Sequence, residues 1–327
     1  MHLFHEGSLA DKTFLVTGGA GFIGSHIVAY LLQHGAKKVR VLDNLLTGLQ
    51  SNVDLFVAEP AYEFILGDIR DRETCDRALA GIDHVSHQAA LGSVPRSVTD
   101  PLTSNDINIS GTLTVFEAAR AAGVKSIVYA SSSSVYGDEP TLPKIESRVG
   151  NPLSPYAVTK KAAELYADVY HKLHGLNILG FRYFNVFGPR QDPNGPYAAV
   201  MPLFVKGILE RTPVWINGDG EQNRDFTYVD NAVQANVRGM LAPNPEAYGK
   251  VYNVAVGENF TVNHLYEAIA GLLASDHKAS YREARAGDIR ASLADISQAR
   301  TFLGYAPTDR FTEGLAKTVE CFKELYG

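Results

Sequence analysis

The chain has 327 residues, of which 45% are hydrophobic and 20% charged, so it is long enough for one domain with its own core and a smaller second lobe. Its formal net charge of −6 excludes a global positive field that would collect nucleic acid or an anionic membrane. The two cysteines, Cys75 and Cys321, lie far apart without metal-ligand spacing, so neither a bound metal nor a disulfide framework is expected.

The beginning of the sequence is mixed and partly acidic, and it lacks the basic start and apolar core of a signal peptide. No run of roughly 18 apolar residues is present, so no membrane span is expected. These features predict a cytoplasmic, water-soluble protein.

The first half of the chain alternates short apolar runs with amphipathic segments. The runs predicted to form buried strands are Phe14–Val16, Val39–Leu42, Phe64–Ile65, Val85–His87, Ile127–Ala130 and Ile178–Phe181. The segments predicted to form helices are Gly24–His34, Asp71–Ala80, Leu102–Ala122 and Tyr156–His174. Alternation at this spacing predicts the α/β class, as a Rossmann-type, doubly wound parallel sheet with helices on both faces.

The pattern changes after about Tyr183, where glycine and proline become frequent. Helical periodicity returns at Ala199–Leu209 and His264–Leu273. We therefore predict a sheet domain over residues 1–184 and 226–255, and a smaller C-terminal α/β lobe over 185–225 and 256–327. Ligands of open α/β sheets bind beyond the carboxyl ends of the strands, so the lobe is expected to close over that edge.

The first predicted strand runs into a glycine-rich turn, and a predicted helix follows. Gly18, Gly21 and Gly24 have the spacing of a dinucleotide-binding loop. Such a loop needs a tight turn, close backbone approach to a pyrophosphate and close packing of helix on strand, and each requirement excludes a Cβ. A glycine string alone can also be a flexible turn, but its place between strand and helix favours phosphate binding at the helix N-terminus.

Asp43 ends the second predicted strand, roughly 20 residues after the loop, where an acidic residue accepts the ribose hydroxyls of an adenosine. A carboxylate there repels a 2′-phosphate, so NAD is favoured over NADP. The alternative is that Asp43 only opens a turn with Asn44. Asp68-Ile69 and Gln88-Ala89-Ala90 follow the third and fourth strands, where they could touch the adenine and let the backbone approach the cofactor.

Tyr156 and Lys160 stand four residues apart on a predicted helix, so their side chains share one face. A phenol has an ordinary pKa near 10, and a nearby ammonium favours its phenolate, which makes the pair a candidate general base. The run Ser131–Ser134 ends the strand upstream, and a hydroxyl there could bond the same substrate oxygen. Alternatively, the tyrosine and lysine are exposed and solvated, and the serines form a polar loop.

As a set, these motifs resemble the extended short-chain dehydrogenase/reductases of the NAD-dependent epimerase/dehydratase family. The resemblance runs from Lys12 to the C-terminus. It includes the glycine loop, Asp43, the serine run with Val135-Tyr136-Gly137, the Tyr156/Lys160 pair, the segment Arg182–Pro189, Arg224-Asp225-Phe226 and Arg285-Ala286-Gly287-Asp288.

The resemblance implies NAD as cofactor and a UDP-sugar as substrate. Implied to bind the cofactor are Gly18, Gly21, Phe22, Ile23, Gly24, Asp43, Asn44, Thr47, Gly48, Asp68, Ile69, Gln88, Ala89, Ala90, Tyr156, Lys160 and Tyr183. Implied to bind the substrate are Ser93, Ser132, Ser133, Ser134, Tyr156, Asn185, Ala199, Val200, Arg224, Arg285, Asp288 and Ser292. Among these, Arg224 and Arg285 can neutralise the diphosphate, although either arginine taken alone could be a surface ion pair.

The implied catalytic residues are Tyr156, Lys160 and Ser132, with Ser133 as the second serine. Dehydratases and decarboxylases of the family carry acidic residues inside the serine motif, and this chain has Ser132, Ser133 and Ser134 there. Oxidation at sugar C4, rotation of the 4-keto sugar and reduction from the other face is then the simplest chemistry, which is 4-epimerisation. A UDP-sugar dehydratase or decarboxylase and a non-catalytic NAD-binding scaffold are the alternatives.

The segments Ala90–Ser97 and Gln191–Tyr197 resemble the subgroup of epimerases that interconverts UDP-N-acetylglucosamine and UDP-N-acetylgalactosamine. Ser292 stands where galactose-only enzymes have a bulky aromatic residue, and a serine leaves room for a 2-acetamido group. The alternative is that Ser292 is a surface residue. Helices Leu102–Ala122 and Tyr156–His174 match the pair that forms a four-helix dimer interface in relatives, so a homodimer is expected.

Overall fold

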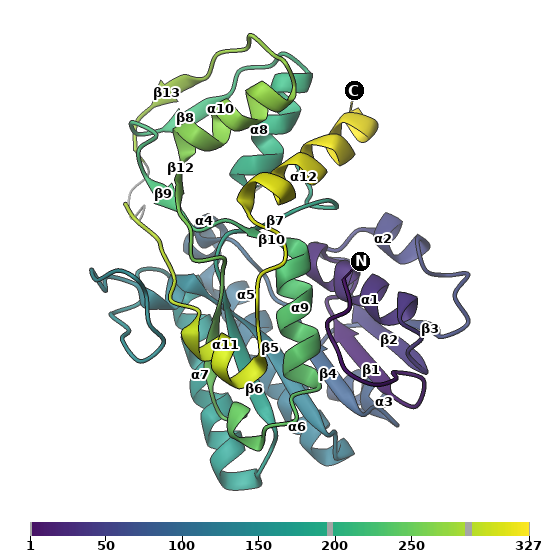
Figure 1. Ribbon diagram of the computed structural model, residues 1–327. Helices are drawn as coiled ribbons and strands as arrows, with labels where there is room; N and C mark the ends of the chain where they lie inside the picture. The colour runs from purple at the N-terminus through teal and green to yellow at the C-terminus, as the bar shows by residue number, and fades with distance from the viewer. Residues whose placement is uncertain (1, 195–198, 285–289, 327) are drawn as a thin grey trace.

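The computed structural model describes residues 2–194, 199–284 and 290–326. The larger part of the molecule is a parallel sheet flanked by helices. A smaller helical lobe lies beyond one end of the sheet's strands (Figure 1). In the described part of the chain, no helix is both long and apolar enough to cross a membrane.

The large sheet has seven strands in the order β11-β6-β5-β4-β1-β2-β3, and all of its neighbours are parallel. Its strands are β1 (Thr13–Thr17), β2 (Lys38–Asp43), β3 (Tyr62–Leu66), β4 (His84–His87), β5 (Ser126–Ser132), β6 (Ile178–Tyr183) and β11 (Val251–Val254). The chain reverses direction across the sheet between β1 and β4, which is the switch point where such folds bind ligands. The predicted Rossmann-type fold is confirmed.

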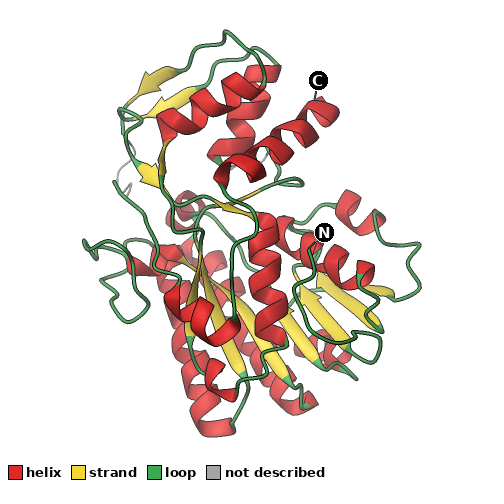
Figure 2. Ribbon diagram, viewed as in Figure 1, coloured by secondary structure: helices red, strands yellow, loops and turns green. Residues whose placement is uncertain are grey.

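Helices cover both faces of the sheet (Figure 2). One buried apolar cluster joins the sheet to α1 (Phe22–Gln33), α9 (Val229–Met240) and α11 (Ser297–Leu303). A second cluster joins the opposite face to α3 (Arg72–Leu79), α6 (Thr112–Ala122) and α7 (Pro155–His174). The sheet is therefore buried on both sides, as its nearly continuous apolar strands require.

The single helix predicted over Leu102–Ala122 is wrong in detail. The segment is divided into α5 (Pro101–Asn105), a π-helix η1 (Asp106–Gly111) and α6. A π-turn inserts one extra residue, and the segment Asp106–Gly111 has only the apolar residues Ile107 and Ile109, too few to define a shift in the apolar repeat. The turn carries Asn108, which is buried.

The smaller lobe has its own buried cluster, formed mainly by α8 (Val200–Leu209), α10 (Val262–Leu272) and α12 (Phe311–Tyr326). Its short strands pair as β8 (Trp215–Asn217) with β13 (Ser280–Arg282), β9 (Asn223–Arg224) with β12 (Phe260–Thr261), and β7 (Val186–Phe187) with β10 (Thr227–Tyr228). The remaining short helices are α2 (Gln50–Asp54), α4 (Val94–Thr99), η2 (Ser133–Tyr136) and η3 (Pro245–Ala247).

The predicted smaller C-terminal lobe is therefore present, and α9 and β11 return the chain to the sheet. Helix α11 packs against β11 and α9, although the predicted boundaries assign its residues to the smaller lobe. Those boundaries remain a prediction.

Candidate active site

A cavity of about 470 Å³ opens at the carboxyl ends of the strands, at the switch point of the sheet. Every residue predicted to bind the cofactor lines it, from the glycine loop to Tyr183. Three residues predicted to bind the substrate, Ser132, Tyr156 and Asn185, line it as well. The fold thus collects residues from six strand ends into one cavity.

The glycine loop has the shape that a dinucleotide requires. Gly18 has φ +71°, and a Cβ there would lie 2.6 Å from the backbone nitrogen of Ala89. A Cβ on Gly24 would lie 2.2 Å from the carbonyl oxygen of Gly18. No side chain caps the start of α1, where Gly21 is the N-cap residue, so its first N–H groups are available to bind a phosphate.

Asp43 lies at the end of β2 and is 8% exposed. Its two oxygens accept hydrogen bonds from the backbone N–H groups of Ala20 (3.0 Å) and Leu45 (2.8 Å). Burial raises the pKa of Asp43, and these hydrogen bonds oppose the rise. Each carboxylate oxygen keeps a free lone pair, so the oriented group can accept both ribose hydroxyls.

Asn44 and Asp68 close the same end of the cavity. The Asn44 amide donates to Asp68 (2.9 Å), and the Arg70 guanidinium forms an ion pair with Asp68 at 2.8 Å. The hydrogen bond from Arg70 is the main reason that the pKa of Asp68 is lowered to about 2. Asp68 is therefore ionised at neutral pH, and its carboxylate oxygens can accept hydrogen bonds from ribose hydroxyls or an adenine amino group.

Helix α7 presents Tyr156 and Lys160 to the cavity from its first two turns. The start of the helix is defined by its N-cap residue, Ser154, which accepts a hydrogen bond from the Ala157 N–H (3.2 Å), and by Pro155 in the first turn. The Lys160 Nζ donates to the carbonyl oxygen of Ala130 (2.8 Å) and lies 5.8 Å from the centre of the Tyr156 ring. Burial lowers the pKa of Lys160 to about 8, so the ammonium form still prevails at pH 7.

Ser132 is the serine that meets the tyrosine. Burial raises the pKa of Tyr156, and a hydrogen bond with Ser132 acts in the opposite direction. The Ser132 hydroxyl also accepts the N–H of Ser134 (3.1 Å). Ser133 does not line the cavity in the described structure, and the Ser134 hydroxyl is buried without a hydrogen-bond partner among the described residues.

Asn108 is a site residue that the sequence analysis missed. From the π-turn it accepts the Leu91 N–H (2.7 Å) and donates to the Leu91 carbonyl (3.1 Å) and to Thr159 Oγ1 (3.1 Å). The Thr159 hydroxyl donates to the Tyr156 carbonyl (2.8 Å). Asn108 thus connects the cavity wall to the helix that carries Tyr156. The only available signal was a polar residue between two isoleucines, Ile107 and Ile109, which does not distinguish Asn108 from the other polar residues of the segment.

Arg224, Ser292 and Asn185 lie in or beside the smaller lobe, and of these only Asn185 lines the main cavity. Arg224 on β9 donates to the Asn223 carbonyl (2.8 Å), and the Ser292 N–H donates to Asn223 Oδ1 (3.1 Å), so Arg224 and Ser292 are neighbours through Asn223. Ser292 is 9% exposed and is not a surface residue. The Asn185 amide donates to the Asp225 carbonyl (3.1 Å).

Three other predicted substrate residues lie outside the main cavity. The Ser93 hydroxyl caps α4 by accepting the Arg96 N–H (3.3 Å). Ala199 is exposed at the start of α8, and Val200 lines a second cavity of about 360 Å³ in the smaller lobe. Arg285 and Asp288 lie outside the described residues.

Comparison with known proteins agrees with this geometry. Residues 14–255 match the NAD-dependent epimerase/dehydratase family. The chain is 40% identical to a UDP-glucose 4-epimerase of Mycolicibacterium smegmatis over 316 residues, which cover 94% of this chain and 98% of that protein.

Two solved structures are similar over nearly their whole length. The UDP-N-acetylglucosamine 4-epimerase from Methanobrevibacter ruminantium, in complex with UDP-N-acetylmuramic acid, has 43% identity and a TM-score of 0.91, with 96% of this chain and 99% of that chain covered. The UDP-glucose 4-epimerase of Thermus thermophilus in complex with NAD has 36% identity and a TM-score of 0.85, with 95% and 99% covered. The chain belongs to the NAD-dependent epimerase/dehydratase family of extended short-chain dehydrogenases.

Proposed function

We propose that the protein is a UDP-sugar 4-epimerase that interconverts UDP-N-acetylglucosamine and UDP-N-acetylgalactosamine and retains bound NAD. The observation that carries the proposal is the meeting of Ser132, Tyr156 and Lys160 in the cavity that the glycine loop and Asp43 also line. The similar epimerases, one named for UDP-N-acetylglucosamine and two for UDP-glucose, support the reaction class. We expect a cytoplasmic enzyme.

In the proposed mechanism, Tyr156 takes the proton of the sugar C4 hydroxyl. Lys160 favours the phenolate electrostatically, and Ser132 donates a hydrogen bond that orients the reacting oxygen. NAD, held by the glycine loop and Asp43 that line the cavity, would supply the acceptor and the donor of the hydride at C4. After the 4-keto sugar rotates, Tyr156 returns the proton to the oxygen at C4, so no group is consumed.

The distribution of carboxylates favours epimerisation over dehydration. A dehydratase needs a second acid–base group to move the C5 proton. Among the described residues, the carboxylates that line the cavity are Asp43 and Asp68, and both lie at its ribose end. Incubation with each of UDP-N-acetylglucosamine, UDP-N-acetylgalactosamine, UDP-glucose and UDP-galactose, with the products separated, tests the proposal. A 4-keto-6-deoxy product would identify a dehydratase.

The cofactor prediction follows from Asp43. Its carboxylate has room for ribose hydroxyls and repels a 2′-phosphate, and the hydride returns to the same sugar, so the cofactor need not leave. We expect purified protein, once denatured, to release NAD. Chromatographic identification of the released nucleotide checks this, and release of NADP would contradict the role of Asp43.

We further propose that the enzyme is a homodimer through α7 and its neighbours. Val158, Leu165, Val169 and Leu173 are 51%, 58%, 45% and 72% exposed, and their spacing places them in one stripe along α7. Leu102 on the adjacent α5 is 82% exposed. A two-fold interface would bury the stripe against its own copy.

Leu165→Glu should therefore dissociate the dimer. Burial of a leucine side chain contributes about 1.5–3 kcal/mol to association. Each two-fold interface contains Leu165 from both subunits, so the dissociation constant of the dimer should rise at least about 10²-fold. Light scattering after size exclusion measures the mass at several concentrations. Leu66→Glu is the control, because Leu66 is similarly exposed (63%) on β3. A dimer that persists in Leu165→Glu would contradict the proposed interface.

A further inference from the structure

The helix that carries Tyr156 and Lys160 has a third attachment to strand β5. Tyr156 bonds with Ser132 and Lys160 bonds with the Ala130 carbonyl, both at the end of β5. One turn further along α7, Glu164 Oε1 accepts a hydrogen bond from Ser131 Oγ at 2.7 Å. Three successive turns of α7 are thus bonded to consecutive residues of one strand end, and the third bond lies outside the proposed catalytic group.

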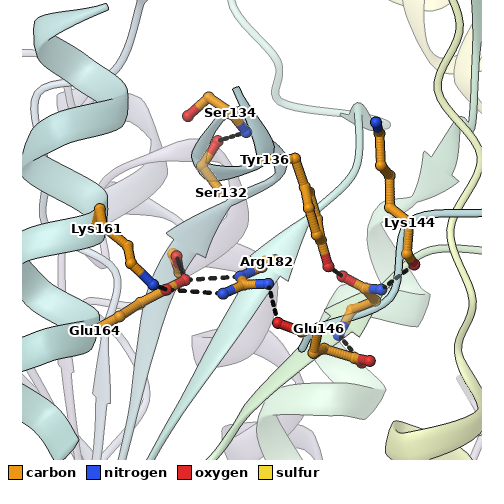
Figure 3. Close-up of polar contacts among 10 residues, drawn as sticks. Ser132, Ser134, Tyr136, Lys144, Glu146, Lys161, Glu164 and Arg182 are labelled. Atoms are coloured by element: carbon orange, nitrogen blue, oxygen red, sulfur yellow. Dashed lines mark hydrogen bonds and ion pairs between the residues drawn. The ribbon is translucent and has the colours of Figure 1, made fainter. Parts of the chain in front are cut away.

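Glu164 is also paired with Arg182 on β6 (Figure 3). The guanidinium donates from Nε to Oε1 (2.8 Å) and from Nη2 to Oε2 (2.9 Å), and the two side chains are only 2% and 4% exposed. Ser131 and Arg182 are direct neighbours in the register of β5 and β6. Lys161, at the rim, adds an ion pair to Oε2 at 3.2 Å.

Further contacts complete this buried network. The Arg182 guanidinium lies 4.8 Å from the centre of the Tyr136 ring and donates to the Glu146 carbonyl (3.0 Å). The Tyr136 hydroxyl donates to Asn253 Oδ1 (2.6 Å), and the Asn253 N–H donates to Glu146 Oε1 (2.9 Å). The network therefore joins β5, β6 and β11 to the loop that precedes α7.

The Glu164–Arg182 pair is ionised. Burial acts to raise the pKa of Glu164, but the hydrogen bond and the charge of Arg182 lower it below its ordinary value. A buried ion pair is costly to desolvate, and apolar side chains of similar volume are often as stabilising. What the pair supplies is geometry, because a planar fork bonded to a carboxylate defines both distance and orientation.

We propose that Glu164 and Arg182, together with Ser131, are positioning residues that hold α7 against the end of β5 so that the Tyr156 hydroxyl meets Ser132. Glu164 is held from two strands at once, by Ser131 of β5 and by Arg182 of β6, so these bonds oppose both sliding and rotation of the helix on the sheet. This inference rests on the proposed function, since it takes Tyr156 as the base.

The test uses the full-length NAD-bound enzyme and the double variant Glu164→Gln/Arg182→Met. Both charges are removed, so neither is left buried and unpaired. We expect a folded protein in which kcat falls about 10-fold to 10²-fold, the scale of a small misplacement of a catalytic group. KM should stay within about twofold, because the pair does not line the main cavity.

The pH profile of kcat distinguishes the two roles, because removing a pair that only stabilises the fold would leave this profile unchanged. The hydrogen bond with Ser132 lowers the pKa of Tyr156, so losing that alignment raises it. Because the base acts when deprotonated, the acidic limb should move to higher pH. Ser131→Ala, which removes one hydroxyl and no charge, should move kcat and the limb in the same directions by a smaller amount. If the double variant does not fold, Ser131→Ala is the test, and because Ser131 also lines the main cavity, an unchanged KM and an unchanged affinity for NAD are required as well; a changed KM would overturn the positioning role.

The control is Arg72→Met/Asp76→Asn, an exposed ion pair on α3, which should change neither readout. The inference would be overturned if the folded variants had the kcat of the wild type and the same acidic limb in the pH profile of kcat. Tyr156→Phe, measured in parallel, separates the two proposals. If it retains turnover, the proposed mechanism fails, and if it loses turnover while the pair variants are unchanged, only the positioning role fails.

Discussion

Tyr156→Phe is expected to lose about 10²-fold to 10⁴-fold in kcat, the usual scale for removal of a general base. The ring stays in place, and only the oxygen that Ser132 contacts is removed. Binding of UDP-sugar should be nearly unchanged, because the phenol contributes to proton transfer rather than to recognition of UDP. Steady-state kinetics and calorimetric titration with UDP-N-acetylglucosamine measure the two quantities.

Tyr166→Phe is the matched control, since Tyr166 is 39% exposed on the same helix and should retain full activity. Lys160→Ala should lose turnover and also bind NAD more weakly, because its ammonium lies in the same cavity. Near-normal kcat in Tyr156→Phe would show that another group takes the C4 proton.

Ser292→Tyr is expected to change substrate choice rather than catalysis. Ser292 is buried, and its N–H is bonded to Asn223, next to Arg224. A tyrosine ring there should fill the space proposed for the 2-acetamido group, whereas UDP-glucose and UDP-galactose carry only a hydroxyl at C2. The clash should cost ~1–3 kcal/mol after local repacking, so kcat/KM for the acetamido sugars should fall about 10-fold to 10²-fold relative to the other pair.

The measurement is the ratio of kcat/KM between UDP-N-acetylglucosamine and UDP-glucose in both proteins. Ser297→Tyr, at an exposed serine on α11, should alter neither value by more than about twofold, as surface substitutions usually do. A uniform loss on both sugars would indicate damage to the lobe, and unaltered turnover of UDP-N-acetylglucosamine would contradict the role of Ser292 as a gate.

The sequence by itself determined the alternation of the first six strands with helices along the chain, the glycine loop and the spacing of Tyr156 and Lys160. These features are local: a strand repeats every two residues, a helix every 3.6, and a pair four apart shares a helix face whatever surrounds it. The close backbone approach at Gly18 and Gly24 could also be predicted from the sequence, because the absence of a Cβ is a property of the residue itself.

The tertiary structure alone decided which side chains become partners. Strand β11 was missed because it lies beyond the strand–helix alternation of the first half of the chain, and only its pairing with β6 places it in the sheet. The π-turn at Asn108 and the cap at Ser93 use residue types that are equally common elsewhere. Ser131 and Glu164 are 33 residues apart, and Arg182 comes from another strand, so their contact exists only once the sheet is assembled. Packing brings these residues together, and no local pattern encodes which of the many polar side chains will meet.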